Sequence, residues 1–398
     1  MKILYYCWDE ITSLDIIDVF KQLDYNVTTF RYELSNKLED YVFTTELTQL
    51  LDNDSYDLIF SFNYFPVISK CANTHNIKYV SWIFDSPNLT LYSNTIFNSC
   101  NYVFSFDNDE VERLRAYGAT TVYHMPLAVN VTRLDKMLSE TITSNDSKCS
   151  INTPSSNYKY DITFLGTLYN DAFNFYDQIG YMPSYYKGYF EGIINTQMNM
   201  YGVDLPSIMI TDDIMKELKP HINISLIDEI FLKEKDFFIQ ILQKKITVTE
   251  RLEILRMICK KHTLTHFAHS TSPLLNNIDF KGYADYMTEM PYIFNSSKIN
   301  LNISLRSIQS GIPLRCMDIM GAGGFLLSNY QKELAYFFEP DKEVVLYDSR
   351  TDLMHKIDYY LNHDDEREEI AHNGKIKIAD QFSYTKVIPN ILNIVLNR

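Results

Sequence analysis

The sequence lacks the patterns that are typical of transmembrane segments, signal peptides and zinc-binding cysteine pairs. It has no run of about 18 consecutive apolar residues, so we expect no transmembrane segment. Its apolar N-terminal stretch is too short for a signal peptide. The 6 cysteines form no Cys-x-x-Cys pair, which argues against a zinc knuckle. A cytoplasmic protein with reduced cysteines is the simplest account.

Positively charged residues are scarce as well. The 36 Lys and Arg residues face 51 Asp and Glu residues, which gives a net charge of −15 at pH 7. This balance argues against nucleic acid as the main partner. Glycine and proline are few, at 12 each, whereas 46% of the residues are hydrophobic. A globular chain of 398 residues is longer than one compact core usually takes, so two domains are expected. The oligomeric state stays open.

Residues 1–135 alternate short apolar runs with amphipathic segments. Alternation of this kind predicts an α/β fold, in which helices cover both faces of a parallel sheet. No Gly-x-Gly-x-x-Gly follows the first apolar run, which argues against a dinucleotide-binding site. The predicted strands are residues 3–7, 26–31, 57–62, 78–84, 102–106 and 121–124. Helices are predicted between them near residues 65–75, 91–99 and 109–117.

Two segments of a different kind interrupt the rest of the chain. Residues 136–159 are polar and rich in turn residues, which predicts a linker. The α/β pattern returns over residues 160–380, but residues 171–260 are helical in pattern and predict a helical insertion. Residues 381–398 hold a final helix. The strands predicted in this half are residues 161–166, 265–269, 300–304, 325–327 and 344–347.

The stretch from Lys298 to Tyr330 has the pattern of a strand, a loop, a helix and a second strand. Pro313 suits the first turn of the helix, where its missing N–H costs nothing. The N-terminus of such a helix suits an anion, phosphate above all. Arginines lie on both sides of the loop, and the Asp318 carboxylate can accept hydrogen bonds from ribose hydroxyls. This pattern predicts a nucleotide site. The alternative is a plain helix with a surface ion pair between Arg315 and Asp318.

Several stretches in combination resemble the CgeB-type (spore maturation protein) glycosyltransferases of bacteria, which have a group 1 glycosyltransferase-like C-terminal half. These stretches are Y-D-L-I-F-S-F-N-Y-F-P (56–66), Y-V-S-W-I-F-D-S-P-N (79–88), Y-V-F-S-F-D (102–107), H-M-P-L-A-V-N (124–130), D-I-T-F-L-G-T-L-Y (161–169), G-Y-A-D-Y-M-T-E-M-P (282–291) and residues 298–330. The resemblance covers most of the chain except residues 171–260. It implies the GT-B architecture, in which two Rossmann-like domains face each other across a cleft. The C-terminal domain would bind the donor and the N-terminal domain the acceptor, and the final helix would return to the N-terminal domain.

The resemblance also implies which residues bind a nucleotide-sugar donor, most of all a UDP-sugar. Many such enzymes carry Glu-x7-Glu before the ribose-binding helix, and the same spacing here gives Ser310 and Asp318. Asp318 can still serve the ribose, whereas Ser310 leaves the donor sugar and the stereochemical outcome open. Arg315 is the first candidate for the diphosphate and Arg306 the second. With arginine and a helix dipole available, no metal is expected to be required. The expected donor-binding residues are Gly166, Thr167, Gly282, Tyr283, Arg306, Ser310, Gly311, Ile312, Arg315 and Asp318.

Three polar residues at predicted strand ends are expected on the acceptor side. Asp85 is the acid/base candidate, because an inverting transfer needs a group that deprotonates the acceptor hydroxyl. Asn63 and Asp107 are expected to shape the acceptor cleft. Alternatively, all three are turn or cap residues.

The hypothesis that follows is a hexosyltransferase that acts on a protein or cell-surface glycan acceptor. Two alternatives stay open. One is a nucleotide-sugar epimerase or hydrolase of the same fold. The other is a non-catalytic protein that binds nucleotide sugars or glycans, in which the missing glutamate marks lost chemistry.

Overall fold

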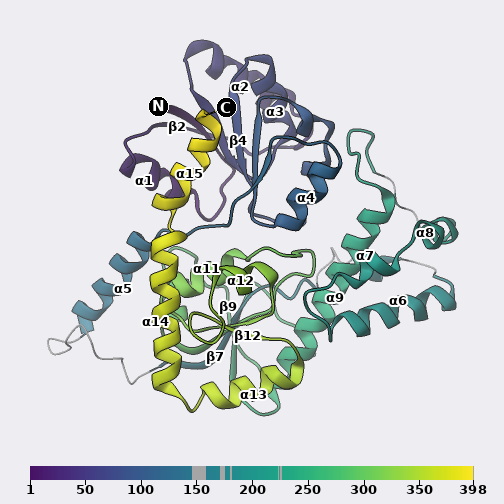
Figure 1. Ribbon diagram of the computed structural model, residues 1–398, viewed down its shortest axis with the longest axis vertical. Coiled ribbons are helices and arrows are strands. Elements are labelled where there is room, and N and C mark those ends of the chain that lie inside the picture. The colour runs from purple at the N-terminus through teal and green to yellow at the C-terminus, as the bar shows by residue number, and fades with distance from the viewer. Residues whose placement is uncertain (146–157, 171–174, 180–181, 223, 225, 398) are drawn as a thin grey trace. The chain divides into compact units, whose positions relative to one another are not determined.

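The protein folds into two compact units, each built on its own parallel sheet (Figure 1). The computed structural model describes residues 1–145, 158–170, 175–179, 182–222, 224 and 226–397. The N-terminal unit contains Met1–Asn130, Leu226–Leu232 and Gln381–Arg398. The C-terminal unit contains Val131–Ser225 and Lys233–Asp380. Two six-stranded parallel sheets with helices confirm the predicted α/β fold class.

The sheet of the N-terminal unit has the strand order β2-β1-β3-β4-β5-β6. The four inner strands of this sheet are mostly apolar and buried on both faces, as expected where helices cover the sheet, whereas the edge strand β2 is largely exposed. The strands are β1 (Lys2–Cys7), β2 (Asn26–Arg31), β3 (Leu58–Phe62), β4 (Lys78–Trp82), β5 (Asn101–Ser105) and β6 (Val122–His124). The helices are α1 (Ser13–Gln22), α2 (Tyr41–Asn53), α3 (Pro66–Thr74), α4 (Asn108–Ala116) and α15 (Tyr384–Leu396).

The helix predicted near residues 91–99 forms two short 3₁₀ turns instead, Leu89–Tyr92 and Asn94–Phe97. The side chain of Asn88 accepts a hydrogen bond from the backbone N–H at the start of the first turn, and Ser93 does the same for the second. Each cap starts a separate 3₁₀ turn, so the segment does not form one continuous helix.

Helix α15 belongs to the N-terminal unit although it ends the chain. Val129 pairs with Ser383 just before the helix. At its start Tyr384 contacts Trp82 of β4 edge-on, with ring centroids 5.8 Å apart. At its end Lys78 of β4 donates a hydrogen bond to the carbonyl of Val395. Figure 1 shows α15 beside strand β4.

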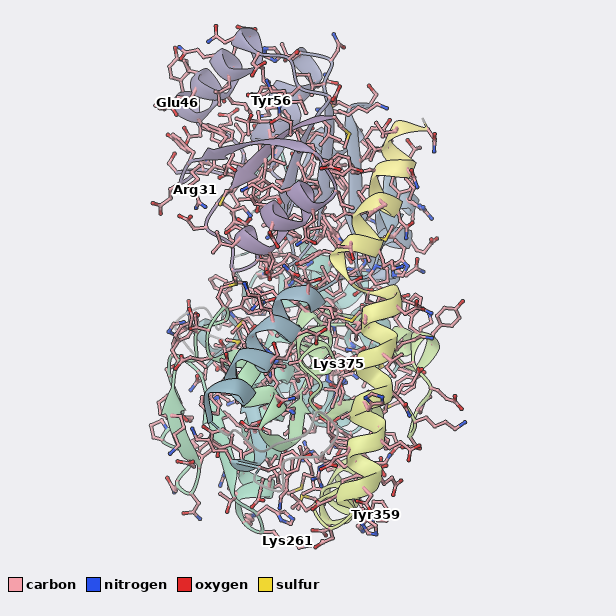
Figure 2. All side chains as sticks on the ribbon, turned by 90° about the vertical axis from the view of Figure 1, so that its left-hand side faces the viewer. Arg31, Glu46, Tyr56, Lys261, Tyr359 and Lys375 are labelled. Carbon is pink, nitrogen blue, oxygen red and sulfur yellow. The ribbon has the colours of Figure 1, made fainter. Side chains whose placement is uncertain are left out.

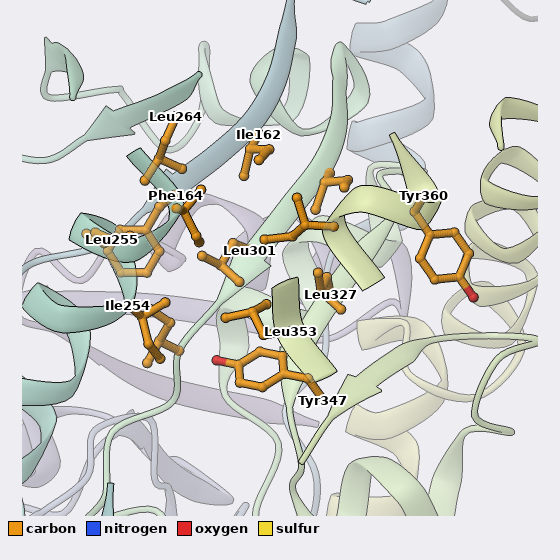
Figure 3. Close-up of a cluster of buried hydrophobic side chains, with 14 of the residues drawn as sticks. Ile162, Phe164, Ile254, Leu255, Leu264, Leu301, Leu327, Tyr347, Leu353 and Tyr360 are labelled. Carbon is orange, nitrogen blue, oxygen red and sulfur yellow. The ribbon is translucent and has the colours of Figure 1, made fainter. Parts of the chain in front are cut away.

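The sheet of the C-terminal unit has the strand order β12-β11-β10-β7-β8-β9. Its strands are β7 (Tyr160–Leu165), β8 (Leu264–Phe267), β9 (Asp279–Gly282), β10 (Ser297–Asn302), β11 (Leu326–Asn329) and β12 (Val345–Tyr347). The short helices beside it are α10 (Met290–Asn295), α11 (Leu314–Gly321) and α12 (Lys332–Phe337), and the longer ones α13 (Arg350–Tyr360) and α14 (Asp364–Gln381). Figure 3 shows the core of this unit, where side chains of β7, β8, β10, β11 and β12 meet those of α9 and α13.

A helical segment stands between β7 and β8, within the range predicted as an insertion. It comprises α6 (Ser184–Gln197), α7 (Leu205–Met209), α8 (Asp212–Leu218) and α9 (Glu234–Cys259). The first three helices share a small apolar core with the first half of α9. The second half of α9 contributes Ile254, Leu255 and Ile258 to the main core, so this helix is also the crossover to β8. Residues 226–232 depart from the segment, because Ile230 pairs with Ser93 of the N-terminal unit.

The predicted linker, residues 136–159, begins inside a helix rather than in a turn-rich segment. Helix α5 spans Val131–Asn145. The hydroxyl of Tyr292 donates to the carbonyl of Met137 at 3.0 Å, and Lys375 of α14 forms an ion pair with Asp135 at 2.6 Å. Figure 2 labels Lys375 on the helix α14. These contacts with α10 and α14 stabilise a helix that the local composition does not favour. Residues 146–157 of the predicted linker lie outside the described residues.

Candidate functional site

The residues expected to bind a donor gather at the carboxyl edge of the C-terminal sheet. The strand order reverses direction between β7 and β10, and in open parallel sheets ligands bind outside such a point. Gly166 and Thr167 follow β7, and the loop of residues 303–313 follows β10. Gly311 and Ile312 are the last residues of that loop before Pro313, which caps α11. Residues 298–330, whose pattern predicts a nucleotide site, therefore reach the edge of the sheet where ligands bind in this topology.

The course of the chain around α11 depends on a proline at one end and glycines at the other. Pro313 precedes the helix with φ −58° and ψ 144°, and it has no N–H to leave unsatisfied. At the other end Gly323 has φ +75°, a conformation that favours glycine. A Cβ at Gly324 would lie 2.7 Å from the carbonyl oxygen of Phe294. The helix therefore ends where the chain must pass very close to α10.

The carboxylate of Asp318 is held between a tyrosine and an arginine. The hydroxyl of Tyr286 donates to Asp318 Oδ1 at 2.9 Å, in a buried position. Arg315 Nη1 lies 3.6 Å from Asp318 Oδ2, and the Arg315 side chain keeps 25% of its surface exposed. The guanidinium also lies over the ring of Phe294, at 5.4 Å from its centroid. Tyr286 belongs to residues 282–291, which carry part of the resemblance. It is 32 residues from Asp318 in sequence, so no local pattern predicts this contact.

Gly282 and Tyr283 end the edge strand β9. Gly282 has φ +81°, and its carbonyl accepts a hydrogen bond from the N–H of Ala268 at 2.9 Å. Tyr283 is half exposed and stacks on His269, with ring centroids 4.3 Å apart and an angle of 15° between the planes. A flat aromatic pair therefore lies beside the glycine that the resemblance assigns to the nucleobase.

Ser310, which occupies the position of the usual glutamate, is bonded to a glutamate from elsewhere in the chain. Its hydroxyl donates to Glu333 Oε1 at 2.7 Å, and its carbonyl accepts from the Glu333 N–H at 3.0 Å. Both residues are buried. A carboxylate is therefore present next to this position, but it comes from α12. The sequence spacing alone gives no signal for it.

Arg306, the second diphosphate candidate, is held in a buried ion pair. Its Nε and Nη2 donate to the two carboxylate oxygens of Glu250 at 2.7 and 2.6 Å. Its Nη1 donates to the carbonyl of Met200 at 2.9 Å, and its guanidinium covers the ring of Tyr201. The Glu250 side chain is 1% exposed and that of Arg306 11%. Arg306 thus links the β10 loop to the helical segment, and the fork of its guanidinium is already matched by a carboxylate in this structure.

Arg251, the neighbour of Glu250 on α9, ties together the ends of two strands. It donates hydrogen bonds to the carbonyls of Ile303, after β10, and Thr167, after β7. Its guanidinium is buried between the rings of Phe164 and Tyr169, and this burial lowers the pKa of Arg251. The loop that carries Gly166 and Thr167 is thus fixed from the helical segment, which the sequence does not indicate.

On the N-terminal unit, Asn63 and Asp85 are bonded to each other. Asn63 Nδ2 donates to Asp85 Oδ2 at 2.8 Å, and Asn63 Oδ1 accepts from the Asp85 N–H at 3.1 Å. Asn63 has φ +60°, a conformation that asparagine tolerates better than most residues. The structure therefore brings together two of the three expected acceptor residues, at the ends of β3 and β4. Asp107 instead caps α4, where its Oδ1 accepts from the Asp109 N–H at 3.1 Å.

Glu10 is a further carboxyl group at the carboxyl edge of this sheet, just after β1. It is 4% exposed, and its Oε2 accepts from the Trp8 N–H at 3.0 Å. Its Oε1 has no hydrogen-bond partner in the part of the chain that the structure describes. Burial raises the pKa of Glu10 to about 7. Its sequence context, Trp-Asp-Glu-Ile, gives no signal that this glutamate is buried.

This burial predicts a pH dependence of stability. The pKa of Glu10 in the folded state is about 7, above its ordinary value of 4.5, so the fold favours the protonated form. The resulting stability is complete below pH 4.5 and is lost as the pH rises through 7. Glu10→Gln should leave stability nearly unchanged at pH 5 and raise it at pH 8, by up to roughly 3 kcal/mol. Urea unfolding at both pH values measures this, and parallel pH profiles for the two proteins would refute it.

Membrane-spanning and metal-binding features were also considered among the residues that the structure describes, from 1 to 145 and in the later ranges given above. No helix among them is long and apolar enough to cross a membrane. In the same residues, no group of three or more His, Cys, Asp and Glu side chains is placed to hold a metal ion.

Comparison with known proteins connects this geometry to glycosyltransferases. Residues 251–393, which include α11 and the loop before it, match the family model described as glycosyl transferase-like. No curated protein matches the chain.

Solved structures match the fold over nearly the whole chain. HepE of Anabaena in complex with UDP and glucose is 10% identical, with a TM-score of 0.54 and 100% of both chains covered. Sucrose-phosphate synthase of Thermosynechococcus elongatus is 8% identical, with a TM-score of 0.55, over 100% of this chain and 98% of that one. A glycosyltransferase of Rickettsia africae is 11% identical, with a TM-score of 0.51, over 99% of this chain and 97% of that one. The chain therefore has the GT-B fold of glycosyltransferases, and its residues 251–393 match the glycosyl transferase-like family.

Proposed function

We propose that this protein is a CgeB-like glycosyltransferase that moves a hexose from a UDP-sugar to a protein or cell-surface glycan acceptor. One observation carries the proposal. Asp318, oriented by Tyr286 and Arg315, lies on the helix that follows the β10 loop, at the reversal point of the sheet and inside the segment that matches the family. This arrangement offers a carboxylate for ribose hydroxyls and a cation for a diphosphate within one turn of a helix.

The C-terminal unit holds the donor in this proposal. Asp318 accepts the ribose hydroxyls, and Gly282 and Tyr283 meet the base. Arg315 and the N-terminus of α11 neutralise the diphosphate, helped by close backbone approach at Gly166 and Gly311. These groups supply the positive charge, so the proposal needs no metal ion. HepE, which shares the fold, has been solved with UDP, and this favours UDP as the nucleotide.

The N-terminal unit binds the acceptor, and Asp85 takes its proton. As the acceptor oxygen bonds to the anomeric carbon, its proton moves to Asp85, and the bond from that carbon to the diphosphate breaks. The leaving diphosphate keeps the electron pair. Asn63 supports this role, because its Nδ2 donates a hydrogen bond to Asp85 Oδ2 and orients the carboxylate, while its Oδ1 accepts from the Asp85 backbone N–H and holds the turn.

The test is release of UDP from UDP-glucose, UDP-galactose and UDP-N-acetylglucosamine, with and without a panel of glycan and protein acceptors, in the presence of a chelator. Acceptor-dependent release is expected, and Asp85→Asn should reduce it by about 10²–10⁴-fold without changing UDP affinity. Asp18→Asn, which changes an exposed carboxylate on α1 of the same unit, is the matched control and should leave release unchanged. Normal turnover of Asp85→Asn would refute the role of Asp85. Release of UDP without any acceptor would instead support a hydrolase.

A further inference from the structure

Helix α5 begins at Val131, the first residue of the C-terminal unit, and its first turn contacts the loop between β9 and α10. Arg133 lies in that turn. Its guanidinium covers the ring of Tyr286, at 5.6 Å from the centroid, and its Nη1 donates to the carbonyl of Met287 at 3.3 Å. Tyr286 is the residue whose hydroxyl donates to Asp318. A cation at the start of the C-terminal unit is therefore linked to this carboxylate through one side chain.

The loop between β9 and α10 is held by hydrogen bonds of its own. The Asp285 carboxylate accepts from the N–H groups of Met287 at 3.0 Å and Thr288 at 2.8 Å, and from the Thr288 hydroxyl at 2.7 Å. In return the Asp285 N–H donates to Glu289 Oε2 at 2.7 Å. The bonds from Thr288 lower the pKa of Asp285, which keeps this carboxyl group charged at neutral pH. The contact with α5 is therefore not needed to form the loop.

Helix α5 holds Arg133 in a fixed position. One turn later, the carbonyl of Met137 accepts from the hydroxyl of Tyr292 of α10, and Asp135 pairs with Lys375 of α14. Arg133 Nη1 also lies 3.2 Å from the sulfur of Met137. The guanidinium is thus supported from its own helix, and α10 and α14 hold that helix in place. No ligand is needed to order it.

The hydrogen bond from Tyr286 to Asp318 is shielded from water, because the two residues are only 5% and 6% exposed. A positive charge over the face of an aromatic ring attracts the ring electrons, and hydrogen bonds in a chain polarise one another. Arg133 therefore makes the Tyr286 hydroxyl a stronger donor and fixes the direction from which it meets Asp318. With Oδ1 held in this way, the remaining acceptor positions of the carboxylate keep one direction.

We propose that Arg133 is a positioning residue for the ribose of the donor and that it acts through Tyr286 on Asp318. The inference rests on the proposed function, which assigns the ribose hydroxyls to Asp318. It adds a residue from the helix that begins where the chain passes from the N-terminal unit to the C-terminal unit. The nucleotide site is thereby tied to the segment that joins the unit proposed for the acceptor to the unit proposed for the donor.

The experiment compares the affinities of UDP and of dideoxy-UDP, which lacks both ribose hydroxyls, by calorimetric titration. Arg133→Met removes the charge and keeps an unbranched side chain. It should weaken UDP roughly 3- to 30-fold, the range of a cation–π contact expressed as affinity, and leave dideoxy-UDP within about twofold of wild type. Both nucleotides carry the same diphosphate, so a general electrostatic effect would weaken both. Arg133→Lys keeps a cation and should recover part of the loss.

Two further variants test the route and the specificity of the effect. Tyr286→Phe removes the hydroxyl but keeps the ring under the guanidinium, and it should weaken UDP without weakening dideoxy-UDP. Adding Arg133→Met to this variant should weaken UDP by less than about twofold more, because the bond to Asp318 is already lost. Lys136→Met removes an exposed cation from the same helix and is the matched control, which should change neither affinity. Thermal unfolding without ligand checks that each variant is folded, and Arg133→Lys and Tyr286→Phe decide the outcome if Arg133→Met is not.

The inference and the proposed function fail in different ways. If Arg133→Met weakens UDP and dideoxy-UDP by the same factor, or weakens neither, Arg133 does not position the ribose. If its full effect persists in the Tyr286→Phe variant, Arg133 does not act through Tyr286. If the wild-type protein binds UDP and dideoxy-UDP equally, Asp318 does not hold the ribose hydroxyls, and the inference falls with that assignment. If the folded wild-type protein binds neither nucleotide, the UDP-sugar donor itself fails.

Discussion

Replacing Arg315 by alanine should reduce kcat/KM for sugar transfer by roughly 10²–10³-fold, the range found when one group that stabilises transition-state charge is removed. The diphosphate gains negative charge as it leaves, so a fixed cation at this point acts mainly in the transition state. The guanidinium is partly exposed and already oriented by Asp318 at 3.6 Å. Steady-state kinetics with the UDP-sugar that the enzyme uses measures the effect.

Two further variants separate this role from a general loss of structure. Arg315→Lys keeps the charge and should recover part of the activity, although lysine cannot bind a diphosphate with two parallel bonds. Arg256→Ala removes an exposed arginine from α9 and should leave kcat/KM unchanged. If Arg315→Ala keeps its fold and turns over within about threefold of wild type, Arg315 does not neutralise the diphosphate.

Replacing Arg306 by methionine should destabilise the protein by about 3–5 kcal/mol, because the buried carboxylate of Glu250 then loses its partner. Glu250 is 1% exposed, and in this variant its carboxylate keeps the hydrogen bond from the hydroxyl of Tyr201 but loses the arginine. Urea unfolding of the variant measures the loss. A double variant, Glu250→Gln with Arg306→Met, removes both charges and should recover much of the stability.

An exposed ion pair provides the control for this prediction. Lys219 and Glu234 lie 2.9 Å apart, but their side chains are 67% and 42% exposed. Lys219→Met should therefore cost less than about 1 kcal/mol. Equal losses of stability for Lys219→Met and Arg306→Met would contradict the prediction, because they would show that the buried Glu250 pair contributes no more to the free energy of unfolding than an exposed pair.

The fold could be predicted from the sequence where local pattern and tertiary structure agree. Strand β10, helix α11 and strand β11 follow the apolar alternation and the glycines of residues 298–330 closely. Strand β9 was missed, because its residues Asp279–Gly282 are partly exposed at the sheet edge and show no apolar alternation. Helix α5 was missed because contacts with α10 and α14, distant in sequence, stabilise it.

The candidate site could be predicted only in its local part. Asp318 and Arg315 are one helical turn apart, so their spacing in sequence already places them together. Their partners come from elsewhere, as Tyr286 does for Asp318 and Glu333 for Ser310. The sequence predicts Arg306 as a diphosphate ligand because its partner Glu250 is 56 residues away along the chain, so no local pattern indicates the ion pair. The identity of a partner is set by the packing of α9 and α12 against the strand ends, which no short motif encodes.

The central claim is that the β10 loop and helix α11 bind a nucleoside diphosphate. Thermal unfolding of the purified protein with UDP, with the other nucleoside diphosphates and with a chelator tests it most directly. UDP at 100 times its dissociation constant should stabilise the protein by about 2.7 kcal/mol, and Asp318→Ala should lose most of this stabilisation. If no nucleoside diphosphate shifts the unfolding of the folded wild-type protein, residues 298–330 are structural and the account is contradicted.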